Sequence, residues 1–283
     1  MENWITIRFF KVHTTNSADP TLDVLINNID KIQPPSQRES ELGQFLRVRL
    51  ERTSVAGSYI SGEVTRIQSQ NMPSEVHPNE TKPLSVTTPL GHGIAFVYNK
   101  SKNVLAIQYD TRILGPSRFM DYLFAKGGNS SASLKPILRQ DAWERFNKGE
   151  PKKFEITVAP PDNFNVLDYD GEAVLRSIKA MAEAHKAATV TISVSVGRSR
   201  KNHLQNIRKT INSLFEAGTS GKLNVQKMKA VMENEDRSHD RHIDFLHELL
   251  SKREKLDLPE NDPDLSYNRR NSAIRAAMTE RGY

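Results

Sequence analysis

Gly-Ile-Ala-Phe-Val-Tyr (93–98), Asn-Lys-Ser-Lys-Asn (99–103) and Val-Leu-Ala-Ile-Gln-Tyr (104–109) are three consecutive runs of this sequence. The first and third are rich in the β-branched and aromatic residues that favour strands. The polar run between them has the length and composition of a hairpin turn. The stretch therefore predicts two adjacent antiparallel strands, and the rest of the first half can be read outward from them.

The flanking sequence predicts further strands and helices. Gly115-Pro116 breaks the second strand, and apolar residues then recur at helical spacing from Phe119 to Gly127, which is a typical helix C-terminus. Earlier in the chain, alternating and periodic apolar residues predict a strand at 4–9, a helix at 22–32, and strands at 45–55 and 58–67.

The second half shows a regular alternation of strand and helix patterns. The expected elements are a strand at 154–158, a helix at 172–185, a strand at 190–196, a helix at 202–215 and a strand at 223–232. This βαβαβ order predicts helices layered over a sheet. Residues 243–250 fit a strand at their start and a helix at their end, and 267–279 reads as a basic terminal helix.

The predicted fold class is therefore α+β. The expected divisions are a β-rich N-terminal domain with the hairpin-helix unit at 1–150 and a basic βαβαβ domain at 151–235. A helical or extended segment at 236–283 is expected to pack on the N-terminal domain or on a dimer partner.

Composition points to a folded protein of the cytoplasm. Of the 283 residues, 37% are hydrophobic, which is enough for a core, and no cysteine is present for disulfides or thiolate chemistry. The N-terminus lacks the pattern of a secretory signal, and no apolar run approaches the roughly 18 residues of a membrane span. No cofactor-binding motif is recognisable, and no catalytic motif either.

The positive charge is concentrated in one segment. Residues 198–229 carry eight basic side chains and the single acid Glu216, whereas the remainder holds 32 basic and 33 acidic residues. A local excess of this kind indicates an electrostatic target such as a nucleic-acid backbone. The candidate DNA-binding residues are Arg198, Arg200, Lys201, Arg208, Lys209, Lys222, Lys227 and Lys229.

The expected positions of these residues favour contact with phosphates. Arg198, Arg200 and Lys201 fall where a strand meets a helix N-terminus, which attracts anions. Lys227 and Lys229 are two apart on a strand and so share one face. Because Phe215 is the only aromatic of the segment and lies on the apolar side of its helix, duplex backbone binding is favoured over base stacking.

The hairpin 93–109, the Ile-Leu-Gly-Pro-Ser run at 113–117 and the Asp-Tyr-Leu-Phe-Ala-Lys-Gly run at 121–127 resemble the middle of the RexA family of phage-exclusion proteins. The later order of strands and helices is similar to that family as far as Leu250. The resemblance implies a protein of antiviral exclusion (abortive infection) that binds double-stranded DNA with little sequence preference. It also implies a homodimer and a small membrane protein as partner.

Other interpretations stay open. A metal-dependent nuclease effector would use acids such as Asp162, Asp168, Asp170 and Glu172, although no acid-x-lysine pair follows them on a strand. The histidines and acids of 239–247 are either metal ligands without a recognisable spacing or a polar turn. The basic segment is alternatively a solvated surface, or an incidental part of a protein-interaction module.

Overall fold

The computed structural model of the chain describes residues 2–43, 46–159, 173–197, 204, 207–219, 223–233, 241–246, 248–259 and 261–283. These residues form an α+β fold, as the sequence predicted. Contacts divide them into two compact units. Unit 1 comprises Met1–Ser133 and Ser251–Tyr283, and unit 2 comprises Leu134–Leu250.

Unit 1 is built on an antiparallel sheet with the strand order β14-β1-β8-β7-β4-β3-β2, and β9 also pairs with β1. The predicted hairpin of 93–109 lies at its centre as β7 and β8, with Tyr98 opposite Leu105. The strands are β1 (Glu2–Thr14), β2 (Ser40–Leu42), β3 (Leu46–Ala56), β4 (Tyr59–Gln68), β7 (Leu90–Asn99), β8 (Val104–Gln108), β9 (Ala132–Pro136) and β14 (Ser251–Asp257).

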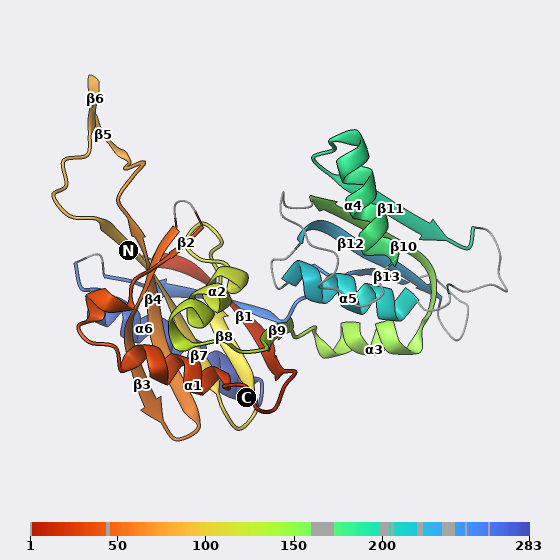
Figure 1. Cartoon of the computed structure of the whole chain (residues 1–283), viewed down its shortest axis with the longest axis horizontal. Helices are drawn as coiled ribbons and strands as arrows, with labels where there is room; N and C mark the ends of the chain where they lie inside the picture. The colour runs from red at the N-terminus through yellow and green to blue at the C-terminus, as the bar shows by residue number, and fades with distance from the viewer. Residues whose placement is uncertain are drawn as a thin grey trace. The chain divides into compact units, whose positions relative to one another are not determined.

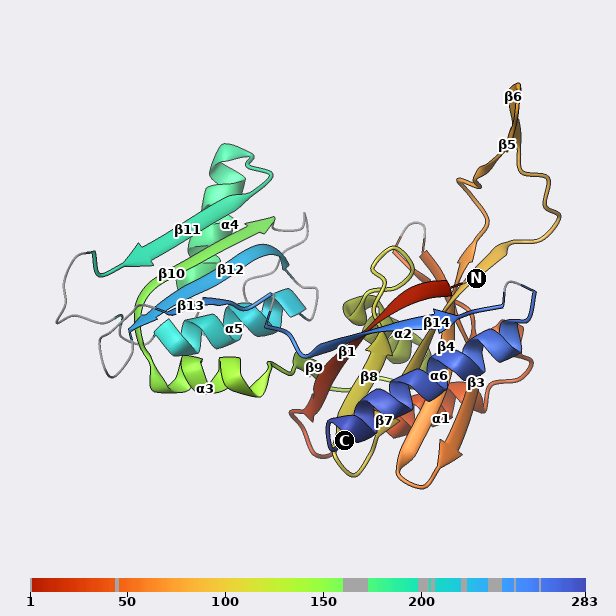
Figure 2. The ribbon, with the colours of Figure 1, turned by 180° about the vertical axis from the view of Figure 1, so that it is seen from behind.

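Helices cover both faces of this sheet (Figures 1 and 2). On one face lie α1 (Leu22–Asp30) and α2 (Pro116–Gly127), with the ring of Phe119 packed edge-on at 5.2 Å from that of Phe96. On the other face lies α6 (Pro263–Glu280), as the figure from behind shows. A short 3-10 helix, η1 (Pro35–Arg38), precedes β2, and a separate hairpin of β5 (Ser74–His77) and β6 (Glu80–Pro83) projects from the unit.

Unit 2 contains a four-stranded antiparallel sheet with the order β11-β10-β12-β13. The predicted βαβαβ order is confirmed. Its elements are α3 (Gln140–Lys148), β10 (Glu150–Ala159), α4 (Ala173–His185), β11 (Val190–Ser195), α5 (Ile207–Thr219), β12 (Asn224–Glu233) and β13 (Arg241–Asp244).

The boundaries of the units differ from the divisions expected at residues 150 and 235. Unit 2 begins earlier because α3, which the sequence analysis did not predict, places Phe146 in its core against Phe245. It ends later because β13 adds Ile243 to the same core. The C-terminal strand and helix belong to unit 1, where β14 pairs with β1.

None of the helices in the described part of the chain is long and apolar enough to cross a lipid bilayer.

Candidate nucleic-acid interface

The sheet of unit 2 has one face packed by helices and one face without a helix on it among the described residues. Phe154, Ile156 and Val158 of β10 are buried together with Ile178 of α4 and Ile211 of α5. Because successive side chains of a strand point to opposite faces, the residues between them lie on the other side of the sheet. Figure 2 shows β11 and β10 in front of α4, so this open face is turned toward the viewer.

The strand register arranges the open face in rows that cross the sheet. Directly paired residues of antiparallel strands share a face. The rows are Ser195, Lys153, Val231 and His242; then Ser193, Glu155, Lys229 and Asp244; then Thr191, Thr157 and Lys227. We call these residues the open face of unit 2. It is polar, and its lysines come from the two central strands.

Two of the predicted DNA-binding lysines lie on this face, and each is paired with an acid. Lys227 forms an ion pair with Glu155, whose other neighbour Lys153 is 3.3 Å away. Lys229 Nζ lies 3.0 Å from Asp244 Oδ2. The Lys227 and Lys153 ammonium groups lower the pKa of the Glu155 carboxyl below its ordinary value. The lysines therefore stand side by side as predicted, in a network with carboxylates.

The structure places Arg208 and Lys209 elsewhere in unit 2. Both belong to α5, which packs on the opposite face of the sheet. Arg208 donates from Nε to the carbonyl of Phe146 at 3.3 Å, and from Nη2 to the carbonyl of Gly149. It thus supplies donors to carbonyls at the end of α3, which lack helical partners. Lys209 is exposed. These two residues do not join the lysines of the open face.

Several predicted residues lie outside the described part of the chain. They are the DNA-binding candidates Arg198, Arg200, Lys201 and Lys222, the nuclease candidates Asp162, Asp168, Asp170 and Glu172, and the histidine-cluster residues His239, Asp240 and His247. The described members of that cluster do not converge, since His242 is exposed and Asp244 pairs with Lys229. The described ranges contain no group of three or more metal-ligating side chains.

Unit 1 contains a buried ion pair that the sequence analysis missed. Arg270 of α6 and Glu63 of β4 are each about 8% exposed, and Arg270 Nη2 lies 2.5 Å from Glu63 Oε1. Arg270 also donates to the carbonyl of Gly93 at 2.7 Å, and Arg52 Nε reaches the second oxygen of Glu63 at 3.1 Å. A Cβ at Gly93 would lie 2.5 Å from Glu63, so the pocket around this carboxylate is full. Through these contacts Arg270 connects α6 to β4 and β7.

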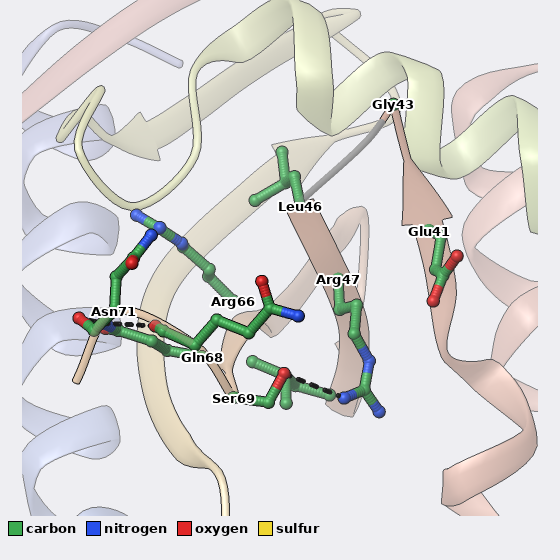
Figure 3. A pocket seen from close by; sticks show the side chains of 10 residues that line it. Glu41, Gly43, Leu46, Arg47, Arg66, Gln68, Ser69 and Asn71 are labelled. Carbon is green, nitrogen blue, oxygen red and sulfur yellow. Dashed lines mark hydrogen bonds between the residues drawn. The ribbon is translucent and has the colours of Figure 1, made fainter.

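Unit 1 also has a polar pocket of about 270 Å³ where β3 and β4 meet the chain leading to the projecting hairpin (Figure 3). Arg47 reaches Ser69 Oγ at 3.4 Å and Gln68 donates to the carbonyl of Asn71 at 2.7 Å, as the dashed lines mark. Arg47 is also bound to Glu39. Arg66 donates to the carbonyl of Arg112. The arginines are thus engaged in local structure.

The described residues thus form a chain of two α+β units, and unit 2 carries a lysine-bearing open sheet face. The chain belongs to the family of unknown function DUF6731, whose family model matches residues 9–280. Among curated proteins, the comparison found no match.

Proposed function

We propose that the chain is a double-stranded DNA-binding protein with little sequence preference. The observation that carries this proposal is the open face of unit 2, where Lys153, Lys227 and Lys229 stand on adjacent strands. This face lies in the unit that holds the charge excess of residues 198–229. A two-stranded ribbon with such side chains lies along a groove or backbone and contacts phosphates rather than bases.

The ion pairs of the open face are compatible with this proposal on energetic grounds. Lys227 and Lys229 are 43% and 48% exposed in their pairs with Glu155 and Asp244. Exposed ion pairs contribute little to stability, so a phosphate can replace a carboxylate at small cost. The released counterions of DNA supply the driving force. Glu155 and Asp244 compete with the phosphates for the two lysines, which keeps the affinity for DNA moderate.

The biological setting that we propose is exclusion of bacteriophages in the cytoplasm, with the chain acting as a homodimer beside a small membrane protein. This part rests on the resemblance to the RexA family over the hairpin and the helix at 116–127. The efficiency of plating of a panel of phages on cells with and without the gene tests this proposal. Equal plating efficiencies on the two strains for every phage would contradict phage exclusion.

The DNA-binding proposal predicts a steep salt dependence. Affinity for unrelated duplexes should be similar, and it should fall linearly with salt on logarithmic axes, because each neutralised phosphate releases counterions. Mobility shifts with several duplexes over a range of salt concentrations measure this.

The same protein incubated with plasmid and Mg²⁺ or Mn²⁺ should shift the plasmid without nicking it. Nicking would favour the nuclease, and tight, salt-insensitive binding to one sequence would also contradict the proposal.

Replacing Lys227 and Lys229 together by alanine is expected to weaken binding to all duplexes alike and to reduce the salt slope by about 2, since two phosphate contacts are lost. Fluorescence anisotropy with labelled duplexes measures both quantities. The melting temperature should change little, because both lysines are on the surface. Unchanged duplex binding would remove these lysines from the interface.

Two matched variants sharpen this test. Lys148→Ala/Lys179→Ala removes the same charge from α3 and α4, where the lysines pair with Glu144 and Glu183, and should have a smaller effect. Glu155→Gln/Asp244→Asn frees Lys227 and Lys229 from their acids and should strengthen duplex binding. Equal weakening by both lysine pairs would indicate that only net charge matters.

A further inference from the structure

A second face with the chemistry of a nucleic-acid site lies in unit 1, on the strands β14, β1 and β8. Lys252 on β14 binds Glu280 of α6, so its neighbours Arg253 and Lys255 point to the opposite face. On β1, Trp4 is opposite Lys255 and Thr6 is opposite Arg253. The set Trp4, Arg8, Tyr109, Arg253 and Lys255 is called the basic-aromatic face below.

This face contains two cation–π contacts. The guanidinium of Arg253 lies 5.0 Å from the ring centre of Trp4, and that of Arg8 lies 3.4 Å from the ring centre of Tyr109. The backbone nitrogen of Tyr109 donates to the carbonyl of Thr6 at 2.7 Å, which fixes the end of β8 beside β1. Stacked guanidinium and aromatic groups are the parts from which proteins build platforms for unpaired bases.

The exposure of Trp4 and the charge of the two arginines make this face suitable for an anionic, aromatic ligand. Trp4 is 59% exposed, although it lies on a strand in the interior of the sheet order. No carboxylate among the described residues forms an ion pair with Arg8 or Arg253, and burial lowers the pKa of the Arg8 guanidinium. Asp257, at the end of β14, is held by Arg269 at 2.6 Å. The face therefore combines an exposed indole with two arginines, Arg8 and Arg253, that have no carboxylate partner among the described residues.

We infer that the basic-aromatic face binds single-stranded nucleic acid, with an unpaired base stacked on Trp4 and the backbone phosphates contacted by Arg253, Arg8 and Lys255. A duplex does not fit this chemistry, because the faces of its bases are covered by their neighbours in the stack. This ligand is distinct from the duplex proposed for unit 2. The inference uses residues of unit 1 alone and does not depend on that proposal.

The test measures the fluorescence of Trp4 in the full chain. Trp4 and Trp143 are the two tryptophans, so Trp143→Phe leaves Trp4 as the sole indole. Titration with a 15-nucleotide oligo-dT or oligo-rU should quench its fluorescence saturably and less at high salt. Fluorescence anisotropy of a labelled oligonucleotide, titrated with the chain without substitutions, should give the same affinity. This second measurement does not depend on Trp143→Phe. Comparing the two probes shows whether DNA or RNA is preferred.

Substitutions then separate stacking from charge. Trp4→Ala should weaken oligonucleotide binding by about 5- to 150-fold, the range expected on losing one stacked base, while Trp4→Phe should retain most of it. Arg253→Ala should reduce the salt slope by about 0.7. Arg118→Ala on α2 removes an exposed arginine bound to Asp121 and serves as the control. Duplex binding should be unchanged by Trp4→Ala, which separates this site from the lysines of unit 2.

Three results would overturn the inference. They are the absence of oligonucleotide binding, equal binding by the Trp4→Ala variant, and quenching of Trp4 by vesicles of anionic phospholipid but not by either oligonucleotide. The last result would assign the exposed indole and its arginines to a membrane surface. Because Trp4 is largely exposed, circular dichroism melting should show the same fold for all variants.

Discussion

Replacing Arg270 by alanine is expected to lower the free energy of unfolding of unit 1 by about 3 kcal/mol. Glu63 would then stay buried without its main partner, and the carbonyl of Gly93 would lose a donor. The expected loss is at the low end of the range for broken buried pairs, because Arg52 still reaches Glu63 from a more exposed position. Chemical denaturation of the full chain measures it, with hydrogen exchange in β4 and β7 to assign the loss to unit 1.

Two further variants make this prediction specific. Arg269→Ala removes the neighbouring arginine, whose partner Asp257 is exposed, and should lower the free energy of unfolding much less than Arg270→Ala does. Adding Glu63→Gln to Arg270→Ala removes the unpaired buried charge and should recover part of the lost stability. Equal losses for Arg269→Ala and Arg270→Ala would show that the buried pair does not hold α6.

Phe245→Ala is expected to destabilise unit 2 by about 3–5 kcal/mol, because it leaves a cavity at the centre of that core. Phe245 is 1% exposed, and its ring lies edge-on to Phe146 at 5.2 Å and near Phe215 at 5.9 Å. Hydrogen exchange should show lost protection in β10 and β12 while β7 and β8 keep theirs.

The control for this prediction is Val194→Ala on β11. Val194 is 37% exposed, so its truncation should cost less than about 1 kcal/mol. Equal loss of protection in β7 and β8 after Phe245→Ala would mean that the two units unfold together. Duplex binding should fall with Phe245→Ala, since the open face depends on the strands of unit 2.

Local sequence patterns predicted the central elements of both units. The apolar runs at 93–98 and 104–109 gave the hairpin of β7 and β8 because each strand is buried and its partner is the next strand along the chain. The alternation of strand and helix patterns predicted the elements from β10 to β12 because each segment carries its own apolar periodicity, although β12 pairs with β10 and not with the preceding strand. The fold class followed from these elements, since neighbouring segments of the chain supply most of the information.

Elements stabilised by distant residues were missed. Ser251–Asp257 reads Ser-Lys-Arg-Glu-Lys-Leu-Asp, which has no apolar alternation, yet it forms β14. Its inward side chains Lys252 and Glu254 bind each other at 2.6 Å, and Lys252 also binds Glu280 of α6, so ion pairs replace apolar packing. The strand exists because β1 offers it a partner, and that partner lies at the other end of the sequence.

The site was predicted only in part for a similar reason. The spacing of Lys227 and Lys229 predicted that both share one face, and they do. Their acidic partners Glu155 and Asp244 come from β10 and β13, and a count of charges within residues 198–229 could not include them. Trp4 and Arg253 form a cation–π contact across strands from the two ends of the chain, so no local motif indicated it.

The way in which unit 2 begins and ends has a consequence for the order of folding during synthesis. Its first and last segments run side by side, with Leu138 bridged to Leu249 and the nitrogen of Leu250 donating to the carbonyl of Ile137 at 2.7 Å. During synthesis on the ribosome, β1 cannot pair with β14 until all of unit 2 has been synthesised, because β14 follows unit 2 in the sequence. If unit 2 folds first, it brings its own two ends together. The entropy cost of closing the loop of residues 134–250 then falls on the folding of unit 2 and not on the pairing of β14 with β1.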